Sequence, residues 1–136
     1  FRITRLVNIC DAGKAINPAV VETQISGAAV MQLGFTMTEN MIIEDGQLTN
    51  PSLADYKIPG FFDLPDAMEN GFIEAEQHNG PFGAKGVGES GTFGVSPAIA
   101  NAIADAVGVR ITRLPITAEA VFRALRAKAG NPLGDA

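Results

Sequence analysis

The spacing of apolar residues along the chain predicts three helices, each opened by a capping residue. The first is expected over about 18–38, after Asn17-Pro18, where asparagine caps the helix and proline occupies a position that needs no backbone N–H. The second follows Ser96-Pro97 and stops at Gly108, and the third follows Thr117. These caps define where each helix begins.

Shorter runs of β-branched and apolar residues predict strands between the helices. They lie at 3–10, 41–44, 72–76 and 109–114. Residues 47–70 contain proline and glycine too often for long elements, and a loop of this length usually has a function or wraps another surface. We therefore expect one α+β unit over residues 1–136, in which a mixed sheet is combined with about three main helices and the tail from about residue 130 is frayed.

Composition describes a packed globular chain, because 46% of the 136 residues are hydrophobic and 18% are charged. A formal net charge of -5 argues against a nucleic-acid or anionic-membrane surface, since these need clustered lysine and arginine. No apolar run reaches the roughly 18 residues of a membrane span. We expect no signal peptide and a cytoplasmic location. Because the chain starts at Phe1 rather than Met, we also expect a segment of something longer or a processed product.

The cysteine and histidine content argues against several common kinds of site. Cys10 is the only cysteine, so an internal disulfide is impossible, and its apolar surroundings predict a buried, inert thiol. His78 is the only histidine and stands in a polar loop, so we expect no metal site there. Asp11, Asp45 and Asp55 are expected to serve turns and caps.

The most informative segment for function is GAKGVGESGTFG at 83–94, where five glycines surround Glu89. Glycine allows positive φ and close approach of the backbone to a ligand, whereas glutamate gains little in such a setting unless its charge has a task. Burial among glycines and small residues would favour the uncharged carboxyl form and suit Glu89 to proton abstraction. Lys85, four residues earlier, would oppose that effect if its ammonium group pointed the same way.

Several interpretations of this segment stay open on the residues alone. Residues 86–91 match G-x-G-x-x-G, and a phosphate- or dinucleotide-binding half-domain would need a strand ending at Gly86 and a helix opening at Gly88. The glycines also suit a plain structural loop, or a non-catalytic interaction module with Glu89 exposed. If Glu89 is a base or a ligand, it should face a cleft bordered by Gln24.

A second unusual pattern lies on the first predicted helix. Gln24, Ala28 and Gln32 form one row at i, i+4 and i+8, next to Gly27 and Ala29. Small residues allow another backbone or a planar ligand to come close, and a glutamine amide both donates and accepts hydrogen bonds. Ordinary helix packing explains the small residues equally well, so the row alone leaves both explanations open.

Six strings spread over nearly the whole chain carry a family resemblance. They are DAGKAINP at 11–18, ETQISGAAVMQLG at 22–34, LTNPSLADYKIP at 48–59, DLP at 63–65, GAKGVGES at 83–90 and SPAIANAIADAVGVRITRLPITAEAV at 96–121. In this order they resemble the molybdenum hydroxylases of the xanthine dehydrogenase, aldehyde oxidase and carbon monoxide dehydrogenase type. The similarity is to the C-terminal part of the large, molybdopterin-binding subunit. It implies that residues 1–136 are a C-terminal segment of the molybdopterin-binding domain.

The resemblance implies roles for four residues. Glu89 corresponds to the active-site glutamate beside molybdenum, which does not itself ligate the metal, and Gln24 to the glutamine whose amide contacts the pyranopterin. Gly88 and Ser90 flank Glu89 and would lie near the cofactor. In that family the glutamate takes a proton from a metal-bound hydroxyl or water, and the oxygen then attacks an electrophilic carbon. The implied function is an oxidoreductase that hydroxylates an aldehyde, an N-heterocycle or a similar carbon centre with water-derived oxygen.

The resemblance also implies cofactors, partners and a branch of the family. Ser90 stands where xanthine- and aldehyde-oxidising members commonly have proline, so the loop looks more like the carbon monoxide dehydrogenase-like and bacterial heterocycle dehydrogenase branches. Ala28 replaces a glycine that is frequent there. The implied cofactor is molybdenum-pyranopterin, as molybdopterin or its cytosine dinucleotide, with iron–sulfur clusters and FAD on partner subunits or domains. Neither nucleic acid nor membrane is an expected partner. Without the remainder of the molybdenum subunit, the segment is expected to hold neither molybdenum nor activity.

Overall fold

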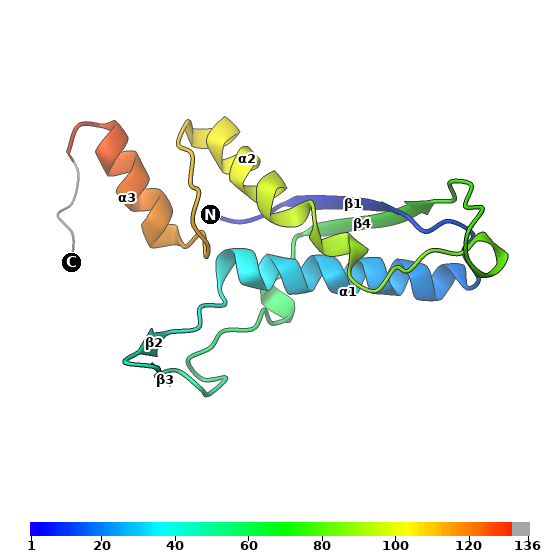
Figure 1. Cartoon of the computed structure of the whole chain (residues 1–136). Helices are drawn as coiled ribbons and strands as arrows, with labels where there is room; N and C mark the ends of the chain where they lie inside the picture. The colour runs from blue at the N-terminus through cyan, green and yellow to red at the C-terminus, as the bar shows by residue number, and fades with distance from the viewer. Residues whose placement is uncertain (132–136) are drawn as a thin grey trace. The chain divides into compact units, whose positions relative to one another are not determined.

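The computed structural model describes residues 1–131 of the chain (Figure 1). They form two compact units, which we call the loop unit and the hairpin unit. The loop unit comprises Arg2–Gln32 and Gly60–Val95, and the hairpin unit comprises Phe1, Leu33–Pro59 and the residues from Ser96 on. Helix α1 (Pro18–Met37) contributes its first part to the loop unit and its last part to the hairpin unit.

The loop unit contains a two-stranded parallel sheet. β1 (Arg5–Asp11) pairs with β4 (Ala67–Ile73), in a register that runs from Arg5 opposite Ala67 to Asp11 opposite Ile73. Burial alternates along β1, because Leu6 is buried whereas Val7 and Ile9 are exposed. This alternation is typical of a sheet that is covered on one face.

The first part of α1 begins where the sequence predicts. The side-chain Oδ1 of Asn17 accepts a hydrogen bond from the backbone N–H of Val20 at 3.3 Å, which confirms the cap. Ile25, Ala28 and Ala29 are buried and belong to the core of the loop unit. Three short 3₁₀ helices complete this unit: η1 (Phe61–Asp63), η2 (Pro81–Gly83) and η3 (Ser90–Thr92).

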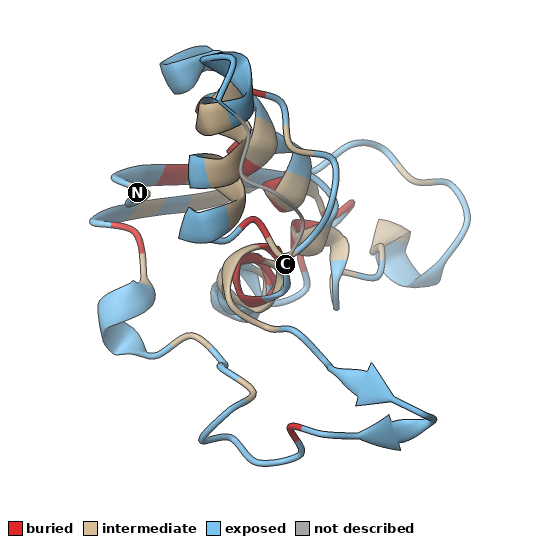
Figure 2. Cartoon of the chain, turned by 90° about the vertical axis from the view of Figure 1, so that its left-hand side faces the viewer, coloured by how far each residue is buried: buried red, intermediate tan, exposed pale blue. Residues whose placement is uncertain are grey.

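The hairpin unit contains β2 (Ile43–Glu44), β3 (Gln47–Leu48), most of α2 (Val95–Val107) and all of α3 (Ala118–Lys128). β2 and β3 pair antiparallel around Asp45 and Gly46, whose φ angles of 49° and 79° suit a tight hairpin turn. Thr117 caps α3, because its side chain accepts a hydrogen bond from the N–H of Ala120 at 3.1 Å. Figure 2 shows the hairpin as exposed.

The α+β class with three main helices is confirmed, and each helix begins and ends close to its predicted bounds. The strands make one parallel and one antiparallel pair, in separate small sheets. The strand predicted at 72–76 begins earlier, at Ala67, because pairing with β1 decides its extent.

The strand predicted at 109–114 is wrong, since this stretch is irregular. Val109 is its one buried residue, and no strand of residues 1–131 pairs with it to satisfy its N–H and C=O groups.

Two further predictions, on membrane spans and on the tail of the chain, can also be compared with the structure. No helix of residues 1–131 is both long and apolar enough to cross a lipid bilayer. The frayed tail predicted from about residue 130 falls mostly outside the described residues, which end at Asn131.

Candidate functional site

Backbone hydrogen bonds join the start of the glycine segment to the residues that follow β1. The N–H of Lys14 donates to the carbonyl oxygen of Gly83 at 2.8 Å, and the N–H of Lys85 donates to that of Ala12 at 3.0 Å. These backbone bonds lie on either side of an isolated antiparallel bridge between Gly13 and Ala84. Gly13 has a φ of 55°, which glycine adopts without strain. The start of the loop is therefore held against the turn after β1.

Glu89 lies at the far side of this loop, directly before η3. Its carbonyl oxygen accepts hydrogen bonds from the backbone N–H of Thr92 at 3.0 Å and from the Thr92 hydroxyl at 2.9 Å. Its carboxylate is exposed and has no hydrogen bond or ion pair with any residue in 1–131. The burial of Glu89 expected from the sequence is therefore not provided by the described part of the chain. The exposure is what a non-catalytic interaction module would also show.

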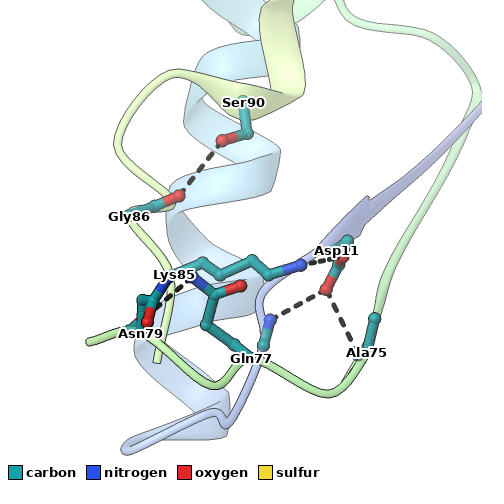
Figure 3. A network of polar contacts seen from close by, with 8 residues as sticks. Asp11, Ala75, Gln77, Asn79, Lys85, Gly86 and Ser90 are labelled. Carbon is teal, nitrogen blue, oxygen red and sulfur yellow. Dashed lines mark hydrogen bonds and ion pairs between the residues drawn. The ribbon is translucent and has the colours of Figure 1, made fainter. Parts of the chain in front are cut away.

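The ammonium group of Lys85 contacts the carboxylate of Asp11 (Figure 3), and no ion pair joins it to Glu89 in residues 1–131. The Nζ of Lys85 donates to Oδ2 of Asp11, and both side chains are about two thirds buried, with 29% and 31% of their areas exposed. Oδ1 of Asp11 accepts hydrogen bonds from the N–H groups of Gly13 at 2.9 Å and Ala75 at 3.3 Å. The Lys85 contact, followed by the Gly13 N–H, lowers the pKa of Asp11 below its ordinary value.

This lowered pKa has a consequence for acid stability that Asp11→Asn tests. The ionised carboxylate stabilises the fold, and the contribution is fully present above the ordinary aspartate pKa of about 3.9 and is lost as the pH falls through the lower folded-state value. We expect the variant to melt at a lower temperature than the wild-type protein at pH 7, with the difference shrinking toward pH 3. Thermal melts at one scan rate across this range measure it. A difference that stays constant down to pH 3 would contradict an ionic contribution.

A surface hollow of about 290 Å³ brings two of the predicted cofactor-binding residues together. Gln24, exposed on α1, and Gly88 of the loop both line it. The complete lining consists of Ala12, Lys14, Ile16, Asn17, Val20, Val21, Gln24, Ala84, Lys85, Val87 and Gly88. Two amides and two lysines line the hollow, and both ammonium groups are paired with carboxylates, that of Lys85 with Asp11 and that of Lys14 with Glu74 at 3.2 Å. The first turn of α1 adds its positive dipole end. The two amides therefore suit a polar, hydrogen-bonding ligand. Glu89 directly follows Gly88 in the sequence but does not line the hollow.

Ser90 makes its contact within the loop. Its hydroxyl donates to the carbonyl oxygen of Gly86 at 3.3 Å, and the side chain is half-buried (Figure 3). Ser90 does not line the hollow with Gln24 and Gly88. Its observed contact is therefore to the loop backbone, and a contact with the cofactor stays a prediction.

The backbone of the loop approaches α1 closely at Ala28. A Cβ added at Gly91 would lie 2.8 Å from the carbonyl oxygen of Ile25 and 3.1 Å from Cβ of Ala28. The Nδ2 of Asn8, on β1, donates to the carbonyl oxygen of Gly91 at 2.8 Å. Sequence reasoning missed Asn8, although a polar residue inside the apolar run LVNIC was a signal. Gly91 thus fits between β1 and α1. At Ala28 the small side chain lets the backbone of the loop come close, and the contact does not test a planar ligand there.

The weaker candidates can be placed as well. Cys10 is half-buried, and burial raises the pKa of its thiol. His78 is exposed, with its Nδ1 3.8 Å from Oε1 of Glu76. Within residues 1–131 no three histidine, cysteine, aspartate or glutamate side chains gather to hold a metal ion.

The structure does not have the elements that a dinucleotide fingerprint needs. No strand of the described residues ends at Gly86, and the nearest one in the chain, β4, ends at Ile73. The 3₁₀ helix η3 begins at Ser90 and α2 at Val95, so no α-helix opens at Gly88. The dinucleotide interpretation of the segment therefore fails on its own requirement.

Comparison with known proteins gives consistent matches. Residues 1–65 match the family model of a molybdopterin cofactor-binding domain. The chain is 38% identical over 122 residues to the xanthine dehydrogenase molybdenum-binding subunit of Escherichia coli O157:H7, which covers 88% of this chain and 16% of that protein. It is 36% identical over 118 residues to the aldehyde oxidoreductase molybdenum-binding subunit of Escherichia coli strain K12, over 85% of this chain and 16% of that one.

A solved structure gives the same result for the fold. Quinoline 2-oxidoreductase from Pseudomonas putida 86 superposes with a TM-score of 0.83 at 36% identity, over 92% of this chain and 16% of that one. The chain thus spans only 16% of the length of these relatives.

Proposed function

The chain belongs to the family of molybdenum-binding subunits of xanthine dehydrogenases and aldehyde oxidoreductases, and we propose that it supplies the catalytic base of such an enzyme. In this proposal residues 1–136 are a C-terminal segment of the molybdopterin-binding domain. Glu89 is the base beside molybdenum, Gln24 and Gly88 contact the pterin, and Ser90 lies near the cofactor. The enzyme is an oxidoreductase that hydroxylates an aldehyde, an N-heterocycle or a similar carbon centre.

The observation that carries the proposal is the shared hollow of Gln24 and Gly88, one residue before Glu89. Its exposed Gln24 amide and open backbone at Gly88 fit the flat, hydrogen-bonding ring system of a molybdenum-pyranopterin. The Gln24 amide offers both a donor and an acceptor to such a ring. No atom lies within 4 Å of a Cβ placed on Gly88, so the backbone there is open to close approach.

The division of labour follows from these residues. The bound cofactor would supply the two-electron oxidation chemistry. Glu89 would accept the proton of the attacking water-derived oxygen at a carboxylate oxygen, for which an exposed carboxylate without competing partners among residues 1–131 is available. Because Lys85 is held by Asp11, its ammonium group does not neutralise that carboxylate. Gln24 would bind and orient the pterin, and Gly88 would leave room for it.

The rest of the site would come from the rest of the subunit. Phe61, Phe62 and Phe82 of the loop unit have 83%, 96% and 88% of their areas exposed, which is costly for aromatic side chains in water. We propose that the remaining part of the molybdenum subunit covers them and completes the cofactor pocket. Electrons would leave through iron–sulfur and flavin partners. The cofactor would be molybdopterin or its cytosine dinucleotide. The enzyme would be cytoplasmic. The segment alone would hold neither metal nor activity.

Replacing Gln24 by alanine in the intact enzyme tests the cofactor contact. Loss of hydrogen bonds worth about 0.5–1.5 kcal/mol each should weaken cofactor retention about two- to tenfold. Molybdenum content by mass spectrometry and the redox titration of the bound cofactor measure the effect. Gln47→Ala, in the exposed hairpin, is the matched control and should leave both unchanged. Wild-type metal content, redox behaviour and rate in Gln24→Ala would remove this residue from the site.

A further inference from the structure

The loop that carries Gly88 and Glu89 is anchored at its first end by an ion pair, in addition to the backbone hydrogen bond from Lys85 to Ala12. Lys85 opens the loop, and its Nζ is held by Oδ2 of Asp11. Asp11 is itself fixed, since it ends β1 and its Oδ1 accepts the N–H groups of Gly13 and Ala75. One carboxylate therefore joins the loop to the turn after β1 and to the chain that follows β4 (Figure 3).

The loop is anchored at its second end by close packing. The carbonyl oxygen of Gly91 accepts the hydrogen bond of Asn8 at 2.8 Å, and the glycine leaves no room for a side chain against Ile25 of α1. Gly91 is buried, whereas Gly86, Gly88 and Glu89 are exposed.

Between these two anchors the loop is held by its own contacts, since the carbonyl oxygen of Glu89 accepts the N–H and the hydroxyl of Thr92 at 3.0 and 2.9 Å. Among residues 1–131, a Cβ on Gly86 or Gly88 would meet no atom within 4 Å, and the Ser90 hydroxyl bonds to Gly86 of the same loop. The place of Glu89 consequently depends on what holds Lys85 and Gly91, together with its own bonds to Thr92.

We propose that Asp11 and Lys85 are positioning residues, whose ion pair fixes the loop so that Glu89 and Gly88 are held in their working positions. The proposal rests on the proposed function of Glu89. The pair is partly buried, so it is less screened by solvent than the exposed Arg5–Glu69 pair on the same sheet, whose side chains are 63% and 54% exposed. A misplacement of about 1 Å at a reacting group can cost roughly 10²-fold in rate, so a loose loop would be felt in turnover.

The test uses the intact enzyme with four variants and one control. Asp11→Asn and Lys85→Met each remove the ion pair, the double variant removes both partners, and Lys85→Arg keeps a cation that can donate to Asp11. Arg5→Met breaks the exposed pair and serves as the control. Turnover is expressed per bound molybdenum, so that lost cofactor does not count as lost catalysis. Amide hydrogen exchange of peptides covering 86–92 reports on the loop independently of activity.

We expect each single loss of the pair to lower kcat per molybdenum about 10- to 100-fold with KM changed less than about threefold. The double variant should be no slower than the slower single one, because the two residues act through one contact. Lys85→Arg keeps a cation opposite Asp11 and should therefore retain a higher kcat per molybdenum than Lys85→Met, which removes the charge. Exchange of 86–92 should accelerate in the two single variants and stay at the wild-type rate in Arg5→Met and Lys85→Arg.

Several outcomes would overturn the proposal. Wild-type kcat per molybdenum in both single variants would do so, as would losses that multiply in the double variant, or unchanged exchange over 86–92. A fall in metal content with unchanged kcat per molybdenum would show a merely structural role. If Lys85→Met cannot be isolated, Asp11→Asn, which preserves shape, decides by the same measurements. Normal turnover in the pair variants together with an inactive Glu89→Gln enzyme would defeat this inference alone, whereas a fully active Glu89→Gln enzyme would defeat the proposed function.

Discussion

Replacing Glu89 by glutamine in the intact enzyme is expected to lower turnover by at least about 10²–10⁴-fold while molybdenum content stays at the wild-type level. Glutamine has nearly the same shape as glutamate but cannot accept the proton. The side chain of Glu89 makes no hydrogen bond or ion pair within the described residues, so the change should not disturb the fold of this segment. Steady-state kinetics and metal analysis of the same preparation measure the two quantities.

A matched control separates loss of the base from loss of a surface charge. Glu44→Gln makes the same chemical change at an exposed position of the hairpin and should leave turnover unaltered. Near-normal turnover in Glu89→Gln would refute the assignment of the base. A loss of metal in proportion to activity would instead give Glu89 a role in holding the cofactor.

Replacing Gly91 by alanine should produce the second large effect. The added Cβ would lie 2.8 Å from the carbonyl oxygen of Ile25 and 3.0 Å from Nδ2 of Asn8, so the loop must move away from α1. Overpacking of this kind costs about 1–3 kcal/mol, and a displaced Glu89 should lower turnover per molybdenum about 10²-fold. Kinetics and thermal melting of the purified enzyme measure the two effects.

Gly94→Ala supplies the control, because it makes the same substitution three residues further on. A Cβ at Gly94 would meet no atom of the described residues within 4 Å, so stability and turnover should stay close to wild type. Equal behaviour of the Gly91 and Gly94 variants would show that the close approach of the loop to α1 has no importance for the site.

The helices could be predicted from the sequence because their signals are local. Asn17 and Thr117 each cap a helix through a hydrogen bond to a residue three positions on, so a short stretch of sequence contains both partners. Gly108, with a φ of 68°, ends α2 for an equally local reason. The strands depended on partners far away in sequence. β4 extends from Ala67 because it pairs with β1, and the stretch at 109–114 has no partner strand within residues 1–131.

The candidate site could be predicted in its residue types but not in its contacts. Glycine spacing singled out Glu89, and the family resemblance singled out Gln24, which shares a hollow with Gly88. The direction of Lys85 could not be derived, because its partner Asp11 lies 74 positions away and was interpreted as a turn residue. The burial of Glu89 predicted from its glycine neighbours is not found, because within residues 1–131 no other segment packs over its carboxylate.

A structure of the intact enzyme with its cofactor bound tests the central claim most directly. We predict that the amide of Gln24 lies within about 2.7–3.2 Å of a pterin nitrogen or oxygen and that the carboxylate of Glu89 faces the metal. The contacts of Lys85 with Asp11 and of Asn8 with Gly91 should be preserved. A cofactor bound away from the hollow of Gln24 and Gly88, with the Glu89 carboxylate directed elsewhere, would contradict the role proposed for this chain.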